Sequence, residues 1–449
     1  MGLSQFGSIP ILQTGLSPIP AIIKAMKELK KYFLRTYGCA ANEKDSQDIK
    51  NTLDKLGFLE TRKFGDADIV ILNSCSVRQA AEDKIYGVGL NLKKGSTLPP
   101  AGGGLNPNRI KPLVILTGCM VGSATGERKR YELSYLQKKI PWVDYFLSPS
   151  QTKEIPNILL KEGFISAIPV SQTIPFPFDG ATSAYINIST GCDNFCSFCV
   201  VPYARGPEIS HTKKEIVDEV KKLANKGFSE ITLLGQNVNS WGLSAKEKSK
   251  LRAGSSHKLP FAQLLREIHK ITEVKKISFL SSNPFDFTKD LIQTLKLPKM
   301  SRYIHIAVQS GDDTILKKMN RRHTAKEFIN LIKKIRKTVP EIEIGTDLIV
   351  GFPGETEEQF INTVKMCQKL KFNVAYISMY SERLGTIAQK LYKNDVPLKE
   401  KRKRHRFLTG VVAMSRHCEA CPERSEGTRR SNLNKIASPS RKLGIAMTR

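Results

Sequence analysis

Three closely spaced cysteines are the part of the sequence that most directly predicts chemistry. Cys192, Cys196 and Cys199 lie four and three residues apart, and they follow an apolar run at residues 185–190 that is predicted to be a strand leading into a loop. We call them the loop trio. A closed zinc site uses four ligands, and a cluster held by four cysteines is saturated, so three thiols predict an iron–sulfur cluster with one open iron. A zinc loop completed by a distant ligand, or three core cysteines, are the alternatives.

A second set of three cysteines is widely spaced but follows a common pattern. Cys39, Cys75 and Cys119, the N-terminal trio, each come directly after a short apolar segment that is predicted to be a strand. The carboxyl ends of neighbouring parallel strands meet at one edge of a sheet, where ligands bind. One such cysteine alone would be an ordinary core residue. Three in the same position predict a second cluster, again with one free iron.

The elements around these cysteines alternate between strands and helices, which predicts an α/β fold. Residues 31–165 are expected to form an open, mostly parallel sheet domain with helices on both faces. Residues 180–405 are expected to form a second domain of six β/α units, a partial or full barrel whose chemistry lies on loops at the carboxyl face of the strands. The expected strands are residues 32–37, 68–73, 112–117 and 143–147 in the first domain, and a strand around 185, 230–234, 276–281, 303–309, 342–350 and 374–380 in the second.

Composition restricts the class of partner and the compartment. The 71 Lys and Arg residues outnumber the 42 Asp and Glu residues, a net charge of +29, which predicts a polyanionic partner such as nucleic acid; a charge excess that serves solubility is the alternative. The nine cysteines are too sparse for a disulfide scaffold, and their odd number also argues against one. No apolar run approaches the roughly 18 residues of a membrane span. We expect a cytoplasmic protein whose residues 1–30 form a disordered leader.

The spacing of the loop trio resembles the signature of the radical S-adenosylmethionine (SAM) enzymes. Together with the N-terminal trio, residues 31–405 resemble the methylthiotransferases of that superfamily, which carry two 4Fe-4S clusters. Three short strings, residues 73–78, 199–206 and 234–239, are similar to the branch that methylthiolates an isopentenyl-type adenosine beside the anticodon of tRNA. Alternatives are a methylthiotransferase acting on threonylcarbamoyl-adenosine or on a ribosomal protein and, outside enzymes, a basic RNA-binding protein with structural metal sites.

The resemblance implies a role for each trio. The loop trio would hold the cluster that binds and cleaves SAM, and the N-terminal trio would hold the auxiliary cluster that carries sulfur. It implies tRNA (the anticodon stem-loop) and an electron-donor protein such as a flavodoxin or ferredoxin as partners of a monomer that does not bind membranes. Small and polar residues after the barrel strands are expected to contact SAM: Gly235, Gln236, Asn237, Ser282, Gln309, Ser310 and Asp347.

Several remaining residues are predicted to have structural roles. His305 lies in an apolar strand and Cys367 on a predicted helix, and both are expected in the core. The basic cluster at residues 317–322 either contacts phosphate or is a solvated helix end. Members of the family usually finish with a small β-barrel, whereas residues 406–449 are predicted to be a disordered basic tail. Cys418 and Cys421 in that tail lack the second ligand pair of a zinc site.

Overall fold

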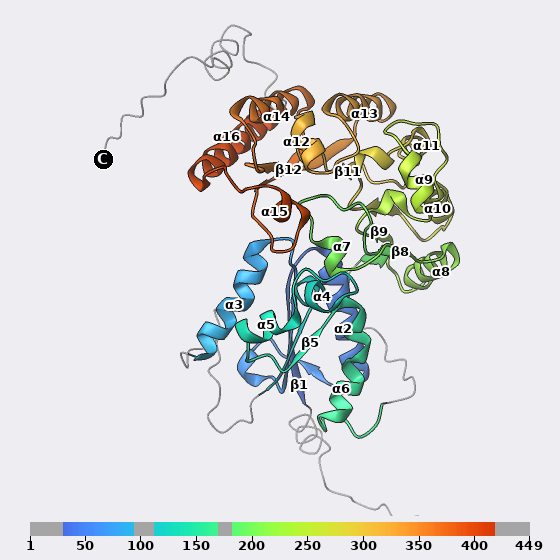
Figure 1. Ribbon diagram of the computed structural model, residues 1–449. Coiled ribbons are helices and arrows are strands. Elements are labelled where there is room, and N and C mark those ends of the chain that lie inside the picture. Colours follow the sequence, from blue (N-terminus) through green and yellow to red (C-terminus); the bar gives the residue numbers. More distant parts are fainter. Residues whose placement is uncertain (1–29, 94–111, 169–181, 418–449) are drawn as a thin grey trace, which may run out of the picture. The chain divides into compact units, whose positions relative to one another are not determined.

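The computed structural model describes residues 30–93, 112–168 and 182–417. The predictions for the leader and for the tail beyond residue 417, with Cys418 and Cys421, therefore lie outside the described residues. The chain divides into two compact units, drawn in Figure 1. Unit 1 comprises Met1–Asp179 and the short segment Tyr203–Arg205, and unit 2 comprises Gly180–Pro202 and Gly206–Arg449.

Unit 1 is built on a five-stranded sheet with the strand order β2-β1-β3-β4-β5, in which every pair is parallel. Its strands are β1 (Lys31–Tyr37), β2 (Leu59–Glu60), β3 (Ile69–Ser74), β4 (Leu113–Thr117) and β5 (Tyr145–Leu147). Every residue of β3 and β4 is buried, as their mostly apolar sequences predict for strands covered on both faces. The predicted open parallel sheet is confirmed.

Helices cover both faces of this sheet. Successive residues of β3 point to opposite sides, so its apolar side chains need a packing partner on each face. Ile69 and Ile71 pack with α2 and α6, and Val70 and Leu72 pack with α3, α4 and α5. Figure 1 shows α2 and α6 on one side of the sheet and α3 and α5 on the other. The helices are α2 (Ala40–Lys55), α3 (Gln79–Lys93), α4 (Cys119–Thr125), α5 (Leu133–Lys139) and α6 (Ile155–Lys161), with short 3-10 turns at Phe64–Asp66 and Pro149–Glu154.

Unit 2 contains two three-stranded parallel sheets, β10-β9-β6 and β11-β12-β13. A parallel bridge between Ser282 and Ile306 joins them just beyond the ends of β10 and β11. The six strands thus follow one another in chain order, and the predicted six-unit partial barrel is confirmed. They are β6 (Ser183–Asn187), β9 (Glu230–Leu234), β10 (Lys276–Phe279), β11 (Tyr303–His305), β12 (Glu343–Val350) and β13 (Val374–Met379); β7 (Ser189–Thr190) and β8 (Ile209–Ser210) form a separate antiparallel pair.

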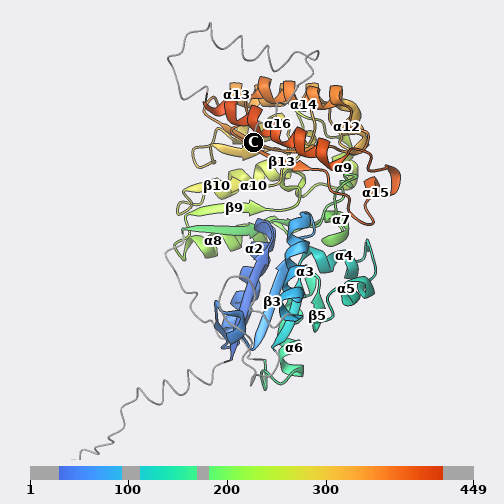
Figure 2. The same cartoon turned by 90° about the vertical axis from the view of Figure 1, so that its left-hand side faces the viewer.

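Three long helices of unit 2, α8, α13 and α14, begin where the sequence places a capping box, a Ser or Thr followed three residues later by Glu or Gln. Thr212, Thr324 and Thr356 each accept a backbone N–H three residues on. Figure 2 shows helices layered over the strands of this unit. The helices are α7 (Val201–Ala204), α8 (Lys213–Ala224), α9 (Ala245–Lys250), α10 (Pro260–His269), α11 (Lys289–Thr294), α12 (Asp313–Lys318), α13 (Ala325–Thr338), α14 (Glu357–Leu370), α15 (Ile387–Leu391) and α16 (Leu398–His417), with 3-10 turns at Val238–Ser240 and Pro284–Asp286.

The last helix corrects the predicted end of the barrel domain. We expected that domain to end at residue 405 and a disordered tail to follow, but α16 continues to His417. Leu408, Val411 and Val412 are buried in the core of unit 2, and their spacing of three and four residues is that of one helix face. The surrounding lysines and arginines obscured this face in the sequence. Among the described residues, no helix combines the length and apolar character that crossing a membrane requires.

Candidate active site

The structure brings the N-terminal trio together at the carboxyl edge of the unit 1 sheet. Cys39 follows β1, Cys75 follows β3 and Cys119 follows β4, and these three strands are adjacent. The thiol of Cys75 is hydrogen-bonded to both Cys39 and Cys119. Residues far apart in the sequence therefore form one cluster of three thiols, and their role as iron ligands remains a prediction.

Hydrogen bonding within the N-terminal trio favours thiolates at two of its members. The hydrogen bond with Cys75 lowers the pKa of Cys39 to about 5, although burial opposes the shift, and the backbone of Asn42 adds a further hydrogen bond. The hydrogen bond with Cys75 likewise lowers the pKa of Cys119 to about 7. The pKa of Cys75 is raised by the same two bonds. Thiolates are the form that binds metal, so the site is prepared for a cationic inorganic group.

A buried amide network holds the loops that carry Cys39 and Cys75. Asn42 donates from Nδ2 to Oδ1 of Asn73 over 2.8 Å, and Asn73 donates from Nδ2 to Oγ of Ser46 over 2.9 Å. Gly118, directly before Cys119, has a φ of +97°, and a Cβ there would lie 2.4 Å from Oδ1 of Asn73. The turn before Cys119 therefore requires glycine.

The loop trio lies in unit 2, and a nitrogen donor reaches each of its sulfurs. Asn194 Nδ2 donates to Cys192 Sγ, the Val201 N–H donates to Cys199 Sγ and Arg321 Nη1 donates to Cys196 Sγ, each over 3.4 Å. Burial raises the pKa of Cys192, with the neighbouring Cys199 thiol as a further cause. N–H donors around sulfur stabilise negative charge on it, which suits cluster ligands.

The end of α12 and the turn after it fix the conformation of the cysteine loop. Ser197 Oγ donates to the Lys318 carbonyl over 2.8 Å, and Asn320 Nδ2 donates to the Phe195 carbonyl over 2.9 Å. Phe195 has a φ of +47°, a left-handed conformation that a non-glycine residue adopts at a cost. The two hydrogen bonds hold the loop in that conformation.

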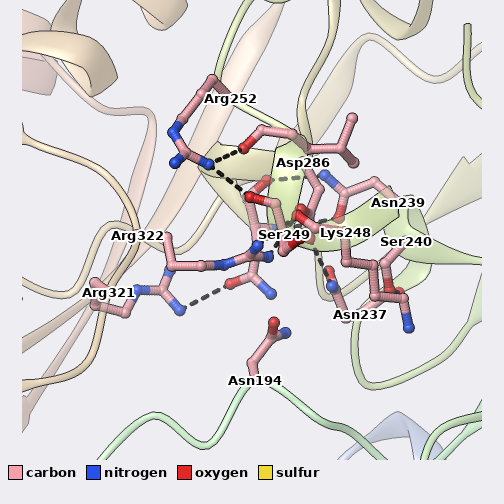
Figure 3. Close-up of polar contacts among 12 residues, drawn as sticks. Asn194, Asn237, Asn239, Ser240, Lys248, Ser249, Arg252, Asp286, Arg321 and Arg322 are labelled. Atoms are coloured by element: carbon pink, nitrogen blue, oxygen red, sulfur yellow. Dashed lines mark hydrogen bonds and ion pairs between the residues drawn. The ribbon is translucent and has the colours of Figure 1, made fainter. Parts of the chain in front are cut away.

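The basic cluster at residues 317–322 is more than a solvated helix end. Arg321 is 8% exposed, donates from Nη1 to Asn283 Oδ1 over 2.8 Å and places its guanidinium 5.2 Å from the centre of the Phe285 ring. Arg322 pairs with Asp286 over 3.2 Å. Both arginines are labelled in Figure 3. The sequence alone did not distinguish the buried Arg321 and the half-buried Arg322 from the lysines before them.

Figure 3 also shows a polar network that joins the loops after β9 and β10. Asn237 Nδ2 donates to Asp286 Oδ2 over 2.8 Å, and Ser240 Oγ donates to a Glu208 carboxylate oxygen over 2.8 Å. The same carboxylate pairs with Lys248 over 2.8 Å. Asp286 is fully buried, and burial raises its pKa while Asn237 and Arg322 oppose the shift. The network fixes the loops at the carboxyl edge of these strands.

Three of the predicted SAM contacts follow β9, and a fourth follows β10. Gly235 packs against β7, since a Cβ there would lie 2.5 Å from Ser189 Oγ. Gln236 Oε1 and Asn237 Oδ1 are buried without a hydrogen-bond partner among the described residues. Ser282 Oγ donates to the His305 carbonyl over 2.5 Å. The two unpaired amide oxygens are acceptors that a bound ligand would satisfy.

The other three predicted contacts lie on the last part of the barrel. Gln309 has a φ of +76°, and Asp347 lies on β12 with Oδ2 2.8 Å from Nε2 of His305. His305 is therefore hydrogen-bonded to a carboxylate, and its side chain is 12% exposed. Ser310 Oγ lies 3.4 Å from Thr363 Oγ1 of α14, so its hydroxyl faces a helix. Cys367 is buried in the core, which raises its pKa to about 12 and confirms the prediction for that residue.

The donor sets fit iron–sulfur clusters. Each trio offers three sulfurs, and N–H donors contact sulfurs of both trios. Within the parts of the chain that the structure describes, no group of three or more His, Cys, Asp or Glu is arranged to hold a single metal ion. A cubane is larger than one ion, because each of its cysteines binds a different iron.

Some residues of these sites were not singled out from the sequence. Asn73 lies in the string 73–78, Arg205 lies in the string 199–206 and Glu208 lies two residues after it, but neither string indicated what the side chains contact. Asp286 follows a predicted strand and was missed, because its partners Asn237 and Arg322 are distant in the sequence. A polar residue directly after a barrel strand was the available signal.

Family models match both parts of the chain. The radical SAM superfamily pattern matches residues 186–367, and the uncharacterized protein family UPF0004 matches residues 31–147. A tRNA-2-methylthio-N(6)-dimethylallyladenosine synthase of Clostridium botulinum (strain Okra / Type B1) is 36% identical over 399 residues, 87% of this chain and 83% of that protein. One of the same name from Clostridium beijerinckii is 35% identical over 86% of this chain and 82% of that protein.

Solved structures show the same fold at low sequence identity. The structure of the radical SAM methyltransferase TsrM from Kitasatospora setae, with cobalamin and a 4Fe-4S cluster bound, matches with a TM-score of 0.52 and 13% identity. The match covers 80% of this chain and 77% of that chain. The likeness supports the arrangement of an α/β domain and a radical SAM domain in one chain.

Proposed function

The chain belongs to the radical SAM methylthiotransferase family, and from that premise we propose that it transfers a methylthio group to carbon 2 of N6-isopentenyladenosine next to the anticodon of tRNA. The observation that carries the proposal is the pair of cysteine trios. One lies on a loop and the other is assembled from three strand ends, so each offers three thiols to a cluster of four irons.

The proposed reaction needs the chemistry of bound cofactors. Carbon 2 of adenine has a strong C–H bond that acid–base groups do not open at neutral pH, and SAM with a reduced 4Fe-4S cluster supplies the radical that does. Cys192, Cys196 and Cys199 would hold the SAM-binding cluster, and Cys39, Cys75 and Cys119 would hold the auxiliary cluster. Each cofactor would be placed by side chains that the fold already fixes.

The residues at the barrel edge would bind and orient SAM. The buried oxygens of Gln236 and Asn237 are acceptors for its amino group, and Asp347 is an acceptor for ribose hydroxyls. Gly235 has no Cβ and so packs closely against Ser189, and it would place the two amide side chains that follow it. We extend the same role to Ser282, Gln309 and Ser310, which lie just beyond the strands. No general base is assigned, because the reaction removes hydrogen as an atom.

The partners follow from charge and from the redox requirement. A net charge of +29 favours binding of tRNA, whose loops expose unstacked bases to protein sites. The radical step consumes an electron, so a donor protein such as a flavodoxin or ferredoxin is required. We propose a monomer that works in the cytoplasm, where its RNA substrate is made.

Mass spectrometry of tRNA nucleosides from a strain lacking the gene tests the proposal. We expect N6-isopentenyladenosine to accumulate and its 2-methylthio derivative to disappear. The wild-type gene and a Cys367→Ala control should restore the product, and Cys196→Ala should not. An unchanged nucleoside would refute the assignment. Loss of a methylthio group from threonylcarbamoyl-adenosine or from a ribosomal protein would move the activity to that target.

A further inference from the structure

A buried arginine contacts the N-terminal trio, although it comes from a distant part of the sequence. Arg205 belongs to the segment Tyr203–Arg205, which groups with unit 1. Its Nε donates to Cys119 Sγ over 3.3 Å. Its Nη2 donates to Asp45 Oδ2 of α2 over 2.6 Å. One guanidinium thus joins a predicted cluster ligand to a carboxylate on a neighbouring helix.

The ion pair between Arg205 and Asp45 is largely buried, so the positive charge of Arg205 acts on the Cys119 sulfur with little screening by solvent. The side chain of Arg205 is 5% exposed and that of Asp45 is 13% exposed. Solvent and salt screen such a buried charge much less than a surface charge. The fixed geometry of the guanidinium lets it donate to sulfur and carboxylate at the same time, which a lysine ammonium reproduces poorly.

Tight backbone packing holds the segment that carries Arg205. A Cβ on Gly122 of α4 would lie 2.0 Å from the Ala204 carbonyl oxygen, and one on Gly126 would lie 3.1 Å from that of Tyr203. The segment therefore lies against α4, the helix that begins at Cys119, at a distance that only glycine at position 122 permits. This backbone contact fixes the position of Arg205 within unit 1.

We propose that Arg205 is the positioning residue of the N-terminal trio, holding the Cys119 sulfur and setting the reduction potential of the cluster bound there. A positive charge and an N–H donor at a cysteine sulfur stabilise the reduced, more negative form of a cluster and raise its potential. Asp45 orients the guanidinium toward the sulfur. This inference rests on the proposed function only in that the N-terminal trio binds a cluster.

The test uses the full chain with Cys192, Cys196 and Cys199 replaced by alanine, so that only the N-terminal trio binds iron. The cluster is titrated anaerobically with dithionite and followed by electron paramagnetic resonance. We expect Arg205→Gln to shift the midpoint to lower potential and Arg205→Lys to shift it less, since lysine keeps the charge. Gly122→Ala, which displaces the segment without removing the arginine, should shift it in the same direction. Arg62→Gln, the same change at an exposed site of unit 1, is the control and should leave it unchanged.

Each outcome decides the proposal. The proposal is overturned if Arg205→Gln binds its full complement of iron and has the same midpoint potential as the Arg62→Gln control. Loss of iron from both Arg205 variants while the circular dichroism of unit 1 stays native supports it, because the arginine is then needed to hold the sulfurs. Loss of iron together with unfolding shows a structural ion pair only and overturns it. Because no RNA is present, a wrong RNA target would leave these results unchanged.

Discussion

Replacing Arg404 by methionine tests how α16 fastens the loop after β12. Arg404 donates from Nη1 to Oε2 of Glu355 and to its carbonyl oxygen, each over 2.8 Å. Glu355 also accepts the Gly351 N–H over 2.7 Å, so the carboxylate closes the loop 351–355. That loop directly follows the strand that carries Asp347, a predicted SAM contact.

The expected cost follows from burial. The side chains of Arg404 and Glu355 are 7% and 1% exposed, so methionine would leave a buried carboxylate without its cation. Breaking such a pair costs about 3–5 kcal/mol. Burial already raises the pKa of Glu355, and the variant removes the arginine that opposes that shift. Protonation of Glu355 would therefore relieve the defect as the pH falls, and the deficit should shrink in acid.

Urea unfolding of unit 2 measures the effect. The chain has two tryptophans, and with Trp142 of unit 1 changed to phenylalanine the buried Trp241 reports unit 2 alone. Arg402→Met is the matched control, because Arg402 is exposed on the same helix, and it should change stability by less than about 0.5 kcal/mol. Glu355→Gln in the Arg404→Met background should recover part of the loss, a coupling of about 0.5–3 kcal/mol.

Two results would show that the reasoning is wrong. One is an Arg404→Met variant as stable as Arg402→Met, because the buried pair would then contribute nothing. The other is a double variant no more stable than Arg404→Met alone, because an unpaired carboxylate would then not be the source of the loss.

Two further predictions concern the turn before Cys119 and a buried histidine of unit 2. Gly118→Ala should remove about half of the bound iron, because its Cβ would lie 2.4 Å from Asn73 Oδ1 at a φ of +97°. The control Gly57→Ala, at a φ of +83° with open space around it, should keep its iron. Equal iron content in the two variants would contradict the steric argument. Burial lowers the pKa of His323 to about 3, so the imidazole stays neutral in the folded protein. In the unfolded chain it becomes protonated below its ordinary pKa of 6.5, so the free energy of unfolding falls as the pH drops from about 6.5 towards 3. Between pH 7 and 5 the wild type should lose about 2 kcal/mol more than His323→Phe in the Trp241 assay, and parallel losses would exclude this source.

The fold was largely readable from the sequence because its elements have clear periods. β3 and β4 are mostly apolar runs, and α8, α13 and α14 begin at Thr caps with Glu or Gln three residues later. The sequence did not predict some of the short elements, such as β2 and α4, whose patterns are too short to show a period. The end of α16 was misjudged because dense basic residues surround its buried face.

The cysteines were easier to predict than their partners. Reactive thiols are few, and their positions after strands indicated that they meet, as the contacts of Cys75 show. The partners of each sulfur are common residues whose roles depend on contacts made over long sequence distances. Arg205 reaches Cys119 across 86 residues, and Arg321 reaches Cys196 across 125. Neither arginine differs by local pattern from the many exposed basic residues of this chain.

Iron analysis of anaerobically purified protein tests the claim that two cysteine trios each hold a cluster. The wild type should contain about eight iron atoms per chain, and the alanine triple variant of either trio about four. Of the two triple variants, the one lacking the N-terminal trio should still form 5′-deoxyadenosine from SAM under reducing conditions, and the one lacking the loop trio should not. A wild-type protein with zinc alone, or with one cluster's iron, would contradict the account.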